Sequence, residues 1–181
     1  MYLILISGLP GSGKTTLGRQ IAARFQVPLI AKDLIKEPLM DVLNQGRKLS
    51  SRLLSDASFA ALFQVAAELV RAKTSLVLEG NFRPGLHESQ IHSLVKIKPD
   101  LELLQVLCRV GESDRLSRLQ ARRAAGERHS GHGDLGPDVV ADRSTDRYLE
   151  IPGARWTAEG IAGQEALLQI LDQKIPPFRR W

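Results

Sequence analysis

The chain has 181 residues, 43% hydrophobic and 25% charged, which is typical of a globular protein with one sizeable core, so we expect a single domain over residues 1–181. Its one cysteine, Cys108, excludes an internal disulfide and a thiolate metal cluster and favours a reducing, cytoplasmic setting. The opening apolar run is too short for a signal peptide, and no stretch approaches the roughly 20 apolar residues of a membrane span, so no membrane partner is expected.

The formal net charge of +5 is compatible with binding to a nucleic acid. Most of the arginine excess, however, lies in residues 109–128, and only 5% of the residues are aromatic, so no stacking platform for bases is visible. The charge therefore favours a nucleotide polyphosphate over a polymer. A nucleic-acid partner stays the less favoured alternative.

Residues 8–15 fit the phosphate-loop pattern G-x-x-x-x-G-K-[ST] without a mismatch. The loop follows an apolar run of strand length at residues 2–6 and precedes a helix predicted over residues 14–25, which is the context that this motif requires. The dinucleotide pattern G-x-G-x-x-G fails at Thr16. The sequence therefore predicts nucleotide contacts from Gly8, Pro10, Gly11, Ser12, Gly13, Lys14, Thr15 and Thr16.

These residue types match the chemistry of a nucleotide bound with magnesium. Glycines allow backbone dihedrals that turn consecutive N–H groups inward around a phosphate, and the helix adds the positive end of its dipole. Lys14 supplies a charge for the β- and γ-phosphates, and Thr15 offers its hydroxyl to Mg²⁺. ATP or GTP with Mg²⁺ is the implied ligand pair.

A second short apolar run at residues 27–31 predicts a strand, and Lys32 and Asp33 stand at its carboxyl end, where parallel sheets bind ligands. Phosphoryl transfer needs a carboxylate to orient or deprotonate the attacking hydroxyl, and Asp33 is our candidate. Lys36 is a candidate contact for the acceptor. Pro38 should interrupt any helix begun at Asp33, so a new helix is expected to start at Pro38.

An amphipathic helix is predicted over residues 56–73, followed by a buried strand at residues 75–78 and by a helix over residues 86–97. Glu79 ends this strand in the position of a Walker B acid, so it could hold magnesium-bound water or a substrate hydroxyl. Asn81 and Arg83 extend the same loop and are candidate acceptor contacts.

The remaining pattern predicts a strand at residues 101–108, a helix over 112–125, a weakly marked strand near 154–156 and a helix over 161–175. On the helix over 112–125, we expect Leu116 and Leu119 to face inward. Arg118 and Arg122 are candidates for covering the triphosphate, because the arginine fork makes two bonds to a phosphate. Arg128, a further candidate acceptor contact, follows in a glycine-rich segment, so residues 112–137 are expected to form a mobile, arginine-rich lid. Pro137 is expected to begin a further helix.

The order of these motifs resembles small P-loop kinases around zeta toxin and chloramphenicol phosphotransferase, which are AAA family ATP-binding proteins. The likeness spans about residues 1–172 and includes the loop, Lys32-Asp33, Leu78-Glu79-Gly80-Asn81-Phe82 and Arg128-His129-Ser130-Gly131-His132. It implies a three-layer α/β fold of the P-loop NTPase type, with a five-stranded parallel sheet, helices on both faces and a lid. It also implies transfer of the γ-phosphoryl group from ATP, with Mg²⁺, to a hydroxyl of a small molecule.

By this resemblance, Asp33 would be the general base, Lys14 and Thr15 would hold phosphate and metal, and Arg118 and Arg122 would be lid arginines. The acceptor is not specified. Two alternatives remain: a nucleotide or polynucleotide 5′-hydroxyl kinase, which the basic charge favours, and a nucleotide-dependent switch that has no acceptor.

Overall fold

The computed structural model describes residues 1–43, 49–126, 129 and 145–175. Within them, one sheet of five strands runs in the order β2-β3-β1-β4-β5, with every neighbouring pair parallel. The strands are β1 (Tyr2–Gly8), β2 (Leu29–Ala31), β3 (Leu76–Glu79), β4 (Glu102–Arg109) and β5 (Ala154–Glu159). The described helices are α1 (Lys14–Phe25), α2 (Lys32–Leu43), α3 (Ser51–Arg71), α4 (Glu88–Ile97), α5 (Glu112–Ala124) and α7 (Gly160–Lys174).

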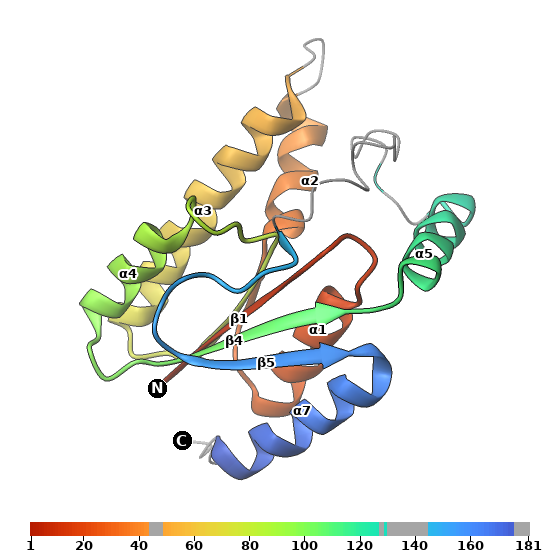
Figure 1. Cartoon of the computed structure of the whole chain (residues 1–181). Helices are drawn as coiled ribbons and strands as arrows, with labels where there is room; N and C mark the ends of the chain where they lie inside the picture. The colour runs from red at the N-terminus through yellow and green to blue at the C-terminus, as the bar shows by residue number, and fades with distance from the viewer. Residues whose placement is uncertain (44–48, 127–128, 130–144, 176–181) are drawn as a thin grey trace.

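Helices cover both faces of the sheet, and the predicted three-layer α/β fold is thereby confirmed (Figure 1). Successive side chains of a strand point to opposite faces, so β1 contributes Leu3 and Leu5 to one core and Ile4 and Ile6 to the other. The first core includes side chains of α3 and α4, and the second includes those of α1 and α7. This double burial explains why β1 is apolar at successive residues.

The carboxyl ends of the central strands meet at one edge of the sheet. Ile6 of β1 stands beside Glu79 of β3, Ala31 of β2 also stands beside Glu79, and Gly8 stands beside Cys108 of β4. Residues that follow β1, β2 and β3 are therefore brought together, although 46 or more positions separate Glu79 from the phosphate loop and from Asp33. This edge is where open parallel sheets bind ligands.

The predicted break at Pro38 is wrong, because α2 continues through it from Lys32 to Leu43. Proline in a helix removes one N–H and leaves the carbonyl four residues earlier without its helical partner. That residue is Leu34, which lies on the exposed side of α2. Packing of α2 against α3 then outweighs the local preference.

Helix α3 begins at Ser51, five residues before the predicted start, because the Ser50 side chain accepts a hydrogen bond from the Leu53 N–H and caps the first turn. The length and hydropathy of α3 would suffice for a membrane span, contrary to the sequence-based expectation. Phe59, Leu62 and Ala66 of this helix are instead buried in the core against the sheet. The helix predicted at Pro137 lies outside the described residues.

The weakly predicted fifth strand is present and longer than expected, from Ala154 to Glu159. The segment 149–151 precedes this strand, and Gln105 of β4 holds the segment in place. The Gln105 amide donates to the carbonyls of Leu149 and Ile151 at 3.3 and 3.2 Å and accepts from the Leu149 N–H at 2.9 Å. These buried bonds order β5, which explains why its own sequence signals it so weakly.

Candidate active site

A cavity of about 670 Å³ opens at the carboxyl edge of the sheet. Such a volume is in the range of sites that hold a small-molecule ligand. Its lining comes from the phosphate loop and α1, from α2 after β2, from residues after β3, and from α5 and α7. Among the predicted site residues, the lining includes Pro10, Gly11, Gly13, Lys14, Thr15, Thr16, Asp33, Glu79, Asn81, Arg118 and Arg122.

The phosphate loop has the backbone of an anion cradle. Gly11 and Gly13 adopt φ angles of +84° and +89°, which residues with a Cβ rarely adopt. A Cβ on Gly11 would also lie 2.9 Å from the carbonyl oxygen of Arg115. Gly8 and Ser12 are not among the lining residues, but the buried Ser12 hydroxyl makes no hydrogen bond to any described residue. The loop is therefore packed from behind, and an unsatisfied hydroxyl lies within it.

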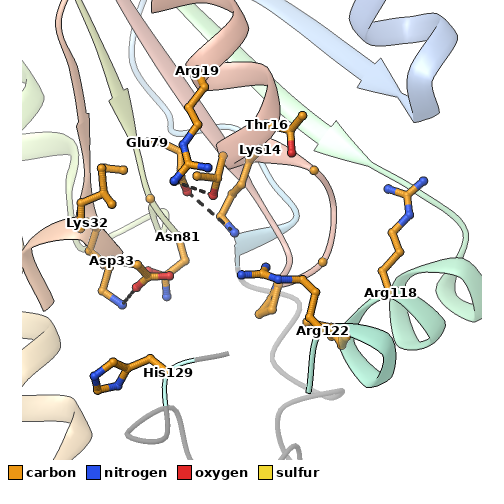
Figure 2. A pocket seen from close by; sticks show the side chains of 18 of the residues that line it. Lys14, Thr16, Arg19, Lys32, Asp33, Glu79, Asn81, Arg118, Arg122 and His129 are labelled. Atoms are coloured by element: carbon orange, nitrogen blue, oxygen red, sulfur yellow. Dashed lines mark hydrogen bonds and ion pairs between the residues drawn. The ribbon is translucent and has the colours of Figure 1, made fainter. Parts of the chain in front are cut away.

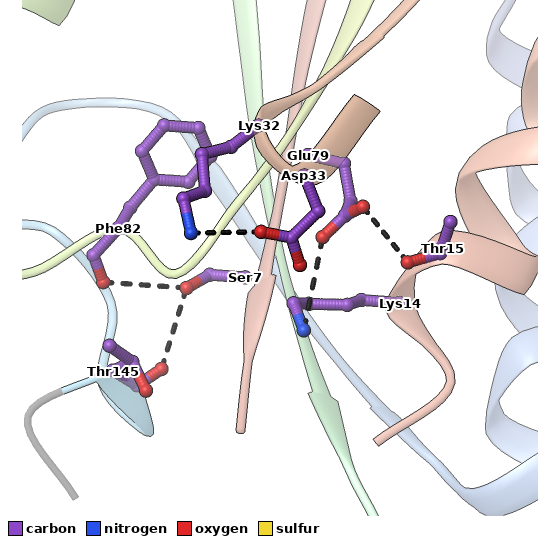
Figure 3. Close-up of polar contacts among 8 residues, drawn as sticks. All are labelled: Ser7, Lys14, Thr15, Lys32, Asp33, Glu79, Phe82 and Thr145. Atoms are coloured by element: carbon purple, nitrogen blue, oxygen red, sulfur yellow. Dashed lines mark hydrogen bonds and ion pairs between the residues drawn. The ribbon is translucent and has the colours of Figure 1, made fainter. Parts of the chain in front are cut away.

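Lys14, Thr15 and Glu79 form a connected group at the loop (Figure 3). The Thr15 hydroxyl donates to Glu79 Oε2 at 3.0 Å, and Lys14 Nζ lies 3.8 Å from Glu79 Oε1. The Glu79 residue is only 2% exposed, and this burial raises the pKa of its carboxyl, while Lys14 and Thr15 partly oppose the rise. Glu79 thus stands where the sequence predicted a Walker B acid.

Asp33 lies in the first turn of α2, and its side chain faces the same cavity with 48% of its surface exposed. Lys32 Nζ donates to Asp33 Oδ1 at 2.8 Å, which orients the carboxylate (Figures 2 and 3). The charge of Asp33 is close enough to Glu79 to contribute to the raised pKa of that carboxyl. The structure therefore brings together the carboxylate and the phosphate loop that the sequence proposed as partners.

Two predicted acceptor contacts, Lys36 and Arg83, are not among the residues that line the cavity. Lys36 is buried, and its ammonium donates to the Ser51 hydroxyl at 2.7 Å; burial, with Lys32 nearby, lowers its pKa. Arg83 is not among the lining residues, and its backbone N–H donates to His87 Nδ1 at 2.9 Å. Arg128 lies outside the described residues. Lys36 is thus held between α2 and α3 rather than at the cavity surface.

Arg118 and Arg122 project from α5 beside the phosphate loop, and Arg122 is directed toward Lys14 (Figure 2). The inward face of α5 differs from the prediction, because Arg115 and Leu119 are buried whereas Leu116 is only partly so. The Arg115 guanidinium donates to the Pro10 carbonyl at 3.4 Å, so this arginine supports the loop from behind. Of the predicted lid, the structure describes α5, Ala125, Gly126 and His129.

Sequence reasoning missed some of the residues that line the cavity, including Arg19 of α1, His129, and Ile161 and Gln164 of α7. Arg19 follows Thr15 by four residues, about one helical turn. This spacing could have predicted that both side chains lie on the same face of the helix. His129 Nε2 lies 2.9 Å from Asp41 Oδ1 of α2. No local pattern marks Ile161 or Gln164, because their position depends on how α7 packs beside the loop.

The donor set at this site fits magnesium. A threonine hydroxyl and a carboxylate are hard oxygen ligands, and Mg²⁺ in such sites keeps waters and takes substrate phosphates as its other ligands. Within the described residues, no group of three or more His, Cys, Asp and Glu could hold a metal ion by protein ligands alone. Thr15 and Glu79 would therefore hold Mg²⁺ together with a nucleotide in the loop.

The phosphate loop after β1, the acid at the end of β3 and the strand order 2-3-1-4-5 define a P-loop NTPase fold. A family model described as an AAA domain matches residues 3–134, and the chain belongs to that family. The expected membership among AAA family ATP-binding proteins agrees with this match.

Individual relatives extend the comparison. A structure from Chloroflexus aurantiacus, described as a candidate kinase, is 29% identical, has a TM-score of 0.85 and is matched over 97% of this chain and 98% of its own. A cytidylate kinase of Methanococcoides burtonii is 26% identical over 61% of this chain and 65% of its own, so the chain spans less than two thirds of that curated relative. A structure from the PezAT toxin-antitoxin system of Streptococcus pneumoniae is 19% identical over 68% of this chain and 53% of its own, with a TM-score of 0.56, and shows likeness of fold alone.

Proposed function

We propose that the protein is a kinase that transfers the γ-phosphoryl group of ATP to a hydroxyl of a small molecule. The observation that carries this proposal is one cavity lined both by the phosphate loop and by Asp33, a carboxylate from a different strand end. A nucleotide in the loop and an acceptor at Asp33 would share the cavity. The likeness to a candidate kinase over nearly the whole chain supports the same reading.

In this proposal the acceptor hydroxyl lies at Asp33, which takes its proton as the oxygen attacks the γ-phosphorus. A new O–P bond forms, the bond from the γ-phosphorus to the bridging oxygen breaks, and ADP leaves with that bond's electron pair. Lys32 holds the carboxylate in position through its 2.8 Å hydrogen bond. Lys14 balances charge on the transferred group, and bound Mg²⁺ would neutralise the phosphates.

Arg118 and Arg122 would cover the phosphates from the α5 side. Both are exposed on α5 and both line the cavity, so they can reach a ligand without a change in the core. Guanidinium groups are always charged, and their fixed fork suits phosphate oxygens. We propose that residues 112–137 close over the nucleotide and exclude water, which would prevent unproductive hydrolysis of ATP.

The decisive experiment is a screen of hydroxyl-bearing metabolites and antibiotics for acceptor-dependent release of ADP. One acceptor that raises the ADP release well above the background of the protein with ATP and Mg²⁺ supports the proposal. The Lys14→Ala variant should lose nucleotide binding and the activity together, whereas Lys96→Ala, an exposed lysine of α4 outside the cavity, should retain both. Slow hydrolysis that no acceptor stimulates would instead favour a nucleotide-dependent switch.

A second candidate function is a nucleoside monophosphate kinase. The observation in its favour is the likeness to two cytidylate kinases, from Methanococcoides burtonii and Pyrobaculum arsenaticum, at 26% and 29% identity. The acceptor would then be a phosphate oxygen, which needs cations more than a base. Including CMP and UMP in the same screen distinguishes the two candidate functions. Rapid ADP release with CMP alone among the compounds would show that the acceptor is a nucleoside monophosphate and not the hydroxyl of another small molecule.

A further inference from the structure

The amide of Gln164, in the second turn of α7, is a polar group without a partner among the described residues. The residue is only 8% exposed, and its side chain lines the cavity. Neither the nitrogen nor the oxygen of its amide makes a hydrogen bond to any residue that the structure describes. The amide nitrogen and oxygen are not fully buried, so they face the cavity, where a ligand can supply the hydrogen-bond partners that the described residues do not.

The position of Gln164 shows which part of a ligand it could reach. A Cβ on Gly13 would lie 2.8 Å from Gln164 Nε2 and 3.8 Å from a terminal nitrogen of Arg118. The amide, the phosphate loop and α5 therefore converge on one point. Asp33 is reached from α2, whereas Arg118 projects from α5 on the other side of Lys14 (Figure 2).

A nucleoside triphosphate is elongated, and its phosphates would occupy the loop between these two ends. With the γ-phosphoryl group directed to Asp33, the nucleoside must extend in the opposite direction, toward α5 and α7. Ile161 stands three residues before Gln164 and shares its helix face, and it also lines the cavity. Ile161 and the Arg118 guanidinium supply surfaces that suit the face of a base.

We infer that Gln164 reads the edge of the nucleobase and selects adenine over guanine. One edge of adenine carries the N6 amino donor next to the N7 acceptor, and a glutamine amide matches it with one acceptor and one donor. The same edge of guanine carries two acceptors, O6 and N7, so one of its bonds is lost. This inference rests on the proposed use of a nucleotide at the phosphate loop, and it names Gln164 as a specificity-determining residue.

Nucleotide binding without any acceptor tests this inference separately from the kinase proposal. Affinities for ADP and for GDP, with Mg²⁺, are measured by calorimetry for the wild type and for Gln164→Leu, which keeps most of the volume that packs on Gly13. The control is Gln169→Leu, an exposed glutamine of the same helix outside the cavity. Circular dichroism and thermal denaturation verify that each variant is folded.

We expect the wild type to prefer ADP, and Gln164→Leu to lose about tenfold or more of its ADP affinity while GDP binding changes little. The Gln169→Leu control should keep the wild-type preference. An equal loss for both nucleotides would show that Gln164 only packs against Gly13, and an unchanged preference would likewise overturn the inference. If the wild type binds neither nucleotide, the kinase proposal is refuted as well. If the wild type shows acceptor-dependent ADP release and Gln164→Leu keeps the wild-type nucleotide preference, only the inference about Gln164 is refuted.

Discussion

Replacing Asp33 by asparagine is the most direct test of the proposed chemistry, because it removes a charge and almost no volume. The amide side chain of Asp33→Asn keeps an oxygen that can accept the 2.8 Å hydrogen bond from Lys32 Nζ. It cannot take a proton from an alcohol. The Asp33 side chain is 48% exposed, but the Lys32 side chain is only 8% exposed, so weakening this ion pair should lower the free energy of unfolding by about 1–2 kcal/mol, more than a surface pair would.

The expected effect on the reaction is much larger than the effect on stability. A positioned general base contributes about 10²–10⁴-fold to a rate. Since each tenfold change corresponds to about 1.4 kcal/mol, the barrier should rise by about 3–5 kcal/mol. The affinity for ADP should change by less than about twofold, because Asp33 lies at the acceptor end of the cavity and contributes nothing to the proposed phosphate cradle.

The assay is acceptor-dependent ADP release at saturating ATP, combined with ADP binding and thermal denaturation. Asp56→Asn provides the matched control, since Asp56 is an exposed aspartate of α3 outside the cavity and its loss should leave all three quantities unchanged. Equal transfer rates in the wild type and in Asp33→Asn would remove this aspartate from the mechanism. A parallel loss of ADP binding would show instead that the substitution disturbs the nucleotide site.

Two further substitutions test the phosphate loop and the acid beside it. Burial raises the pKa of Glu79, so its ionised form opposes folding, and wild-type stability should decline as the pH rises above the ordinary glutamate value. Glu79→Gln should therefore flatten the decline of urea midpoints as the pH rises above 4.5, the ordinary glutamate value, and it should also lower the transfer rate. A variant with the wild-type slope would contradict the reasoning. Gly11→Ala should cost more stability than the αL penalty of about 1–2 kcal/mol, because its Cβ would meet the Arg115 carbonyl at 2.9 Å, and it should weaken ADP binding. Gly85→Ala, at φ +78° with nothing within 4 Å of the added Cβ, should show only the backbone penalty and normal ADP binding; equal losses in the two alanine variants would exclude the close contact as a cause.

Much of the fold could be predicted from the sequence because its main signals are local. The predicted helix over residues 14–25 agrees with α1, since its apolar spacing follows directly on the loop glycines. The buried strands β1, β3 and β4 are apolar at nearly successive residues, which only a sheet covered on both faces explains. Local signals failed where packing overrode them, as at Pro38, where contact between α2 and α3 maintains one continuous helix.

The residues of the site also fall into two groups, those that local sequence predicted and those that only the tertiary structure places. Spacing along the chain identified the residues that follow one another in a motif, such as Lys14 and Thr15, and those at strand ends, such as Asp33 and Glu79. Residues within one motif have nearly fixed relative positions, because only a few backbone bonds separate them. A strand end also has a predictable neighbourhood in a parallel sheet.

Tertiary structure alone decided which other side chains reach the cavity. Lys36 and Arg83 are close in sequence to Asp33 and Asn81, which line the cavity, yet they are not among its lining residues, because neighbouring side chains of a helix or loop point in different directions. Leu116 and Leu119 were the residues of α5 expected to face inward, yet Arg115 is buried as well and supports Pro10 from behind. Gln164 reaches the loop from 151 positions past Gly13, since α7 packs beside α1 on the same face of the sheet. Local sequence thus determined the phosphate-loop motif, while the packing of distant helices determined which side chains surround it.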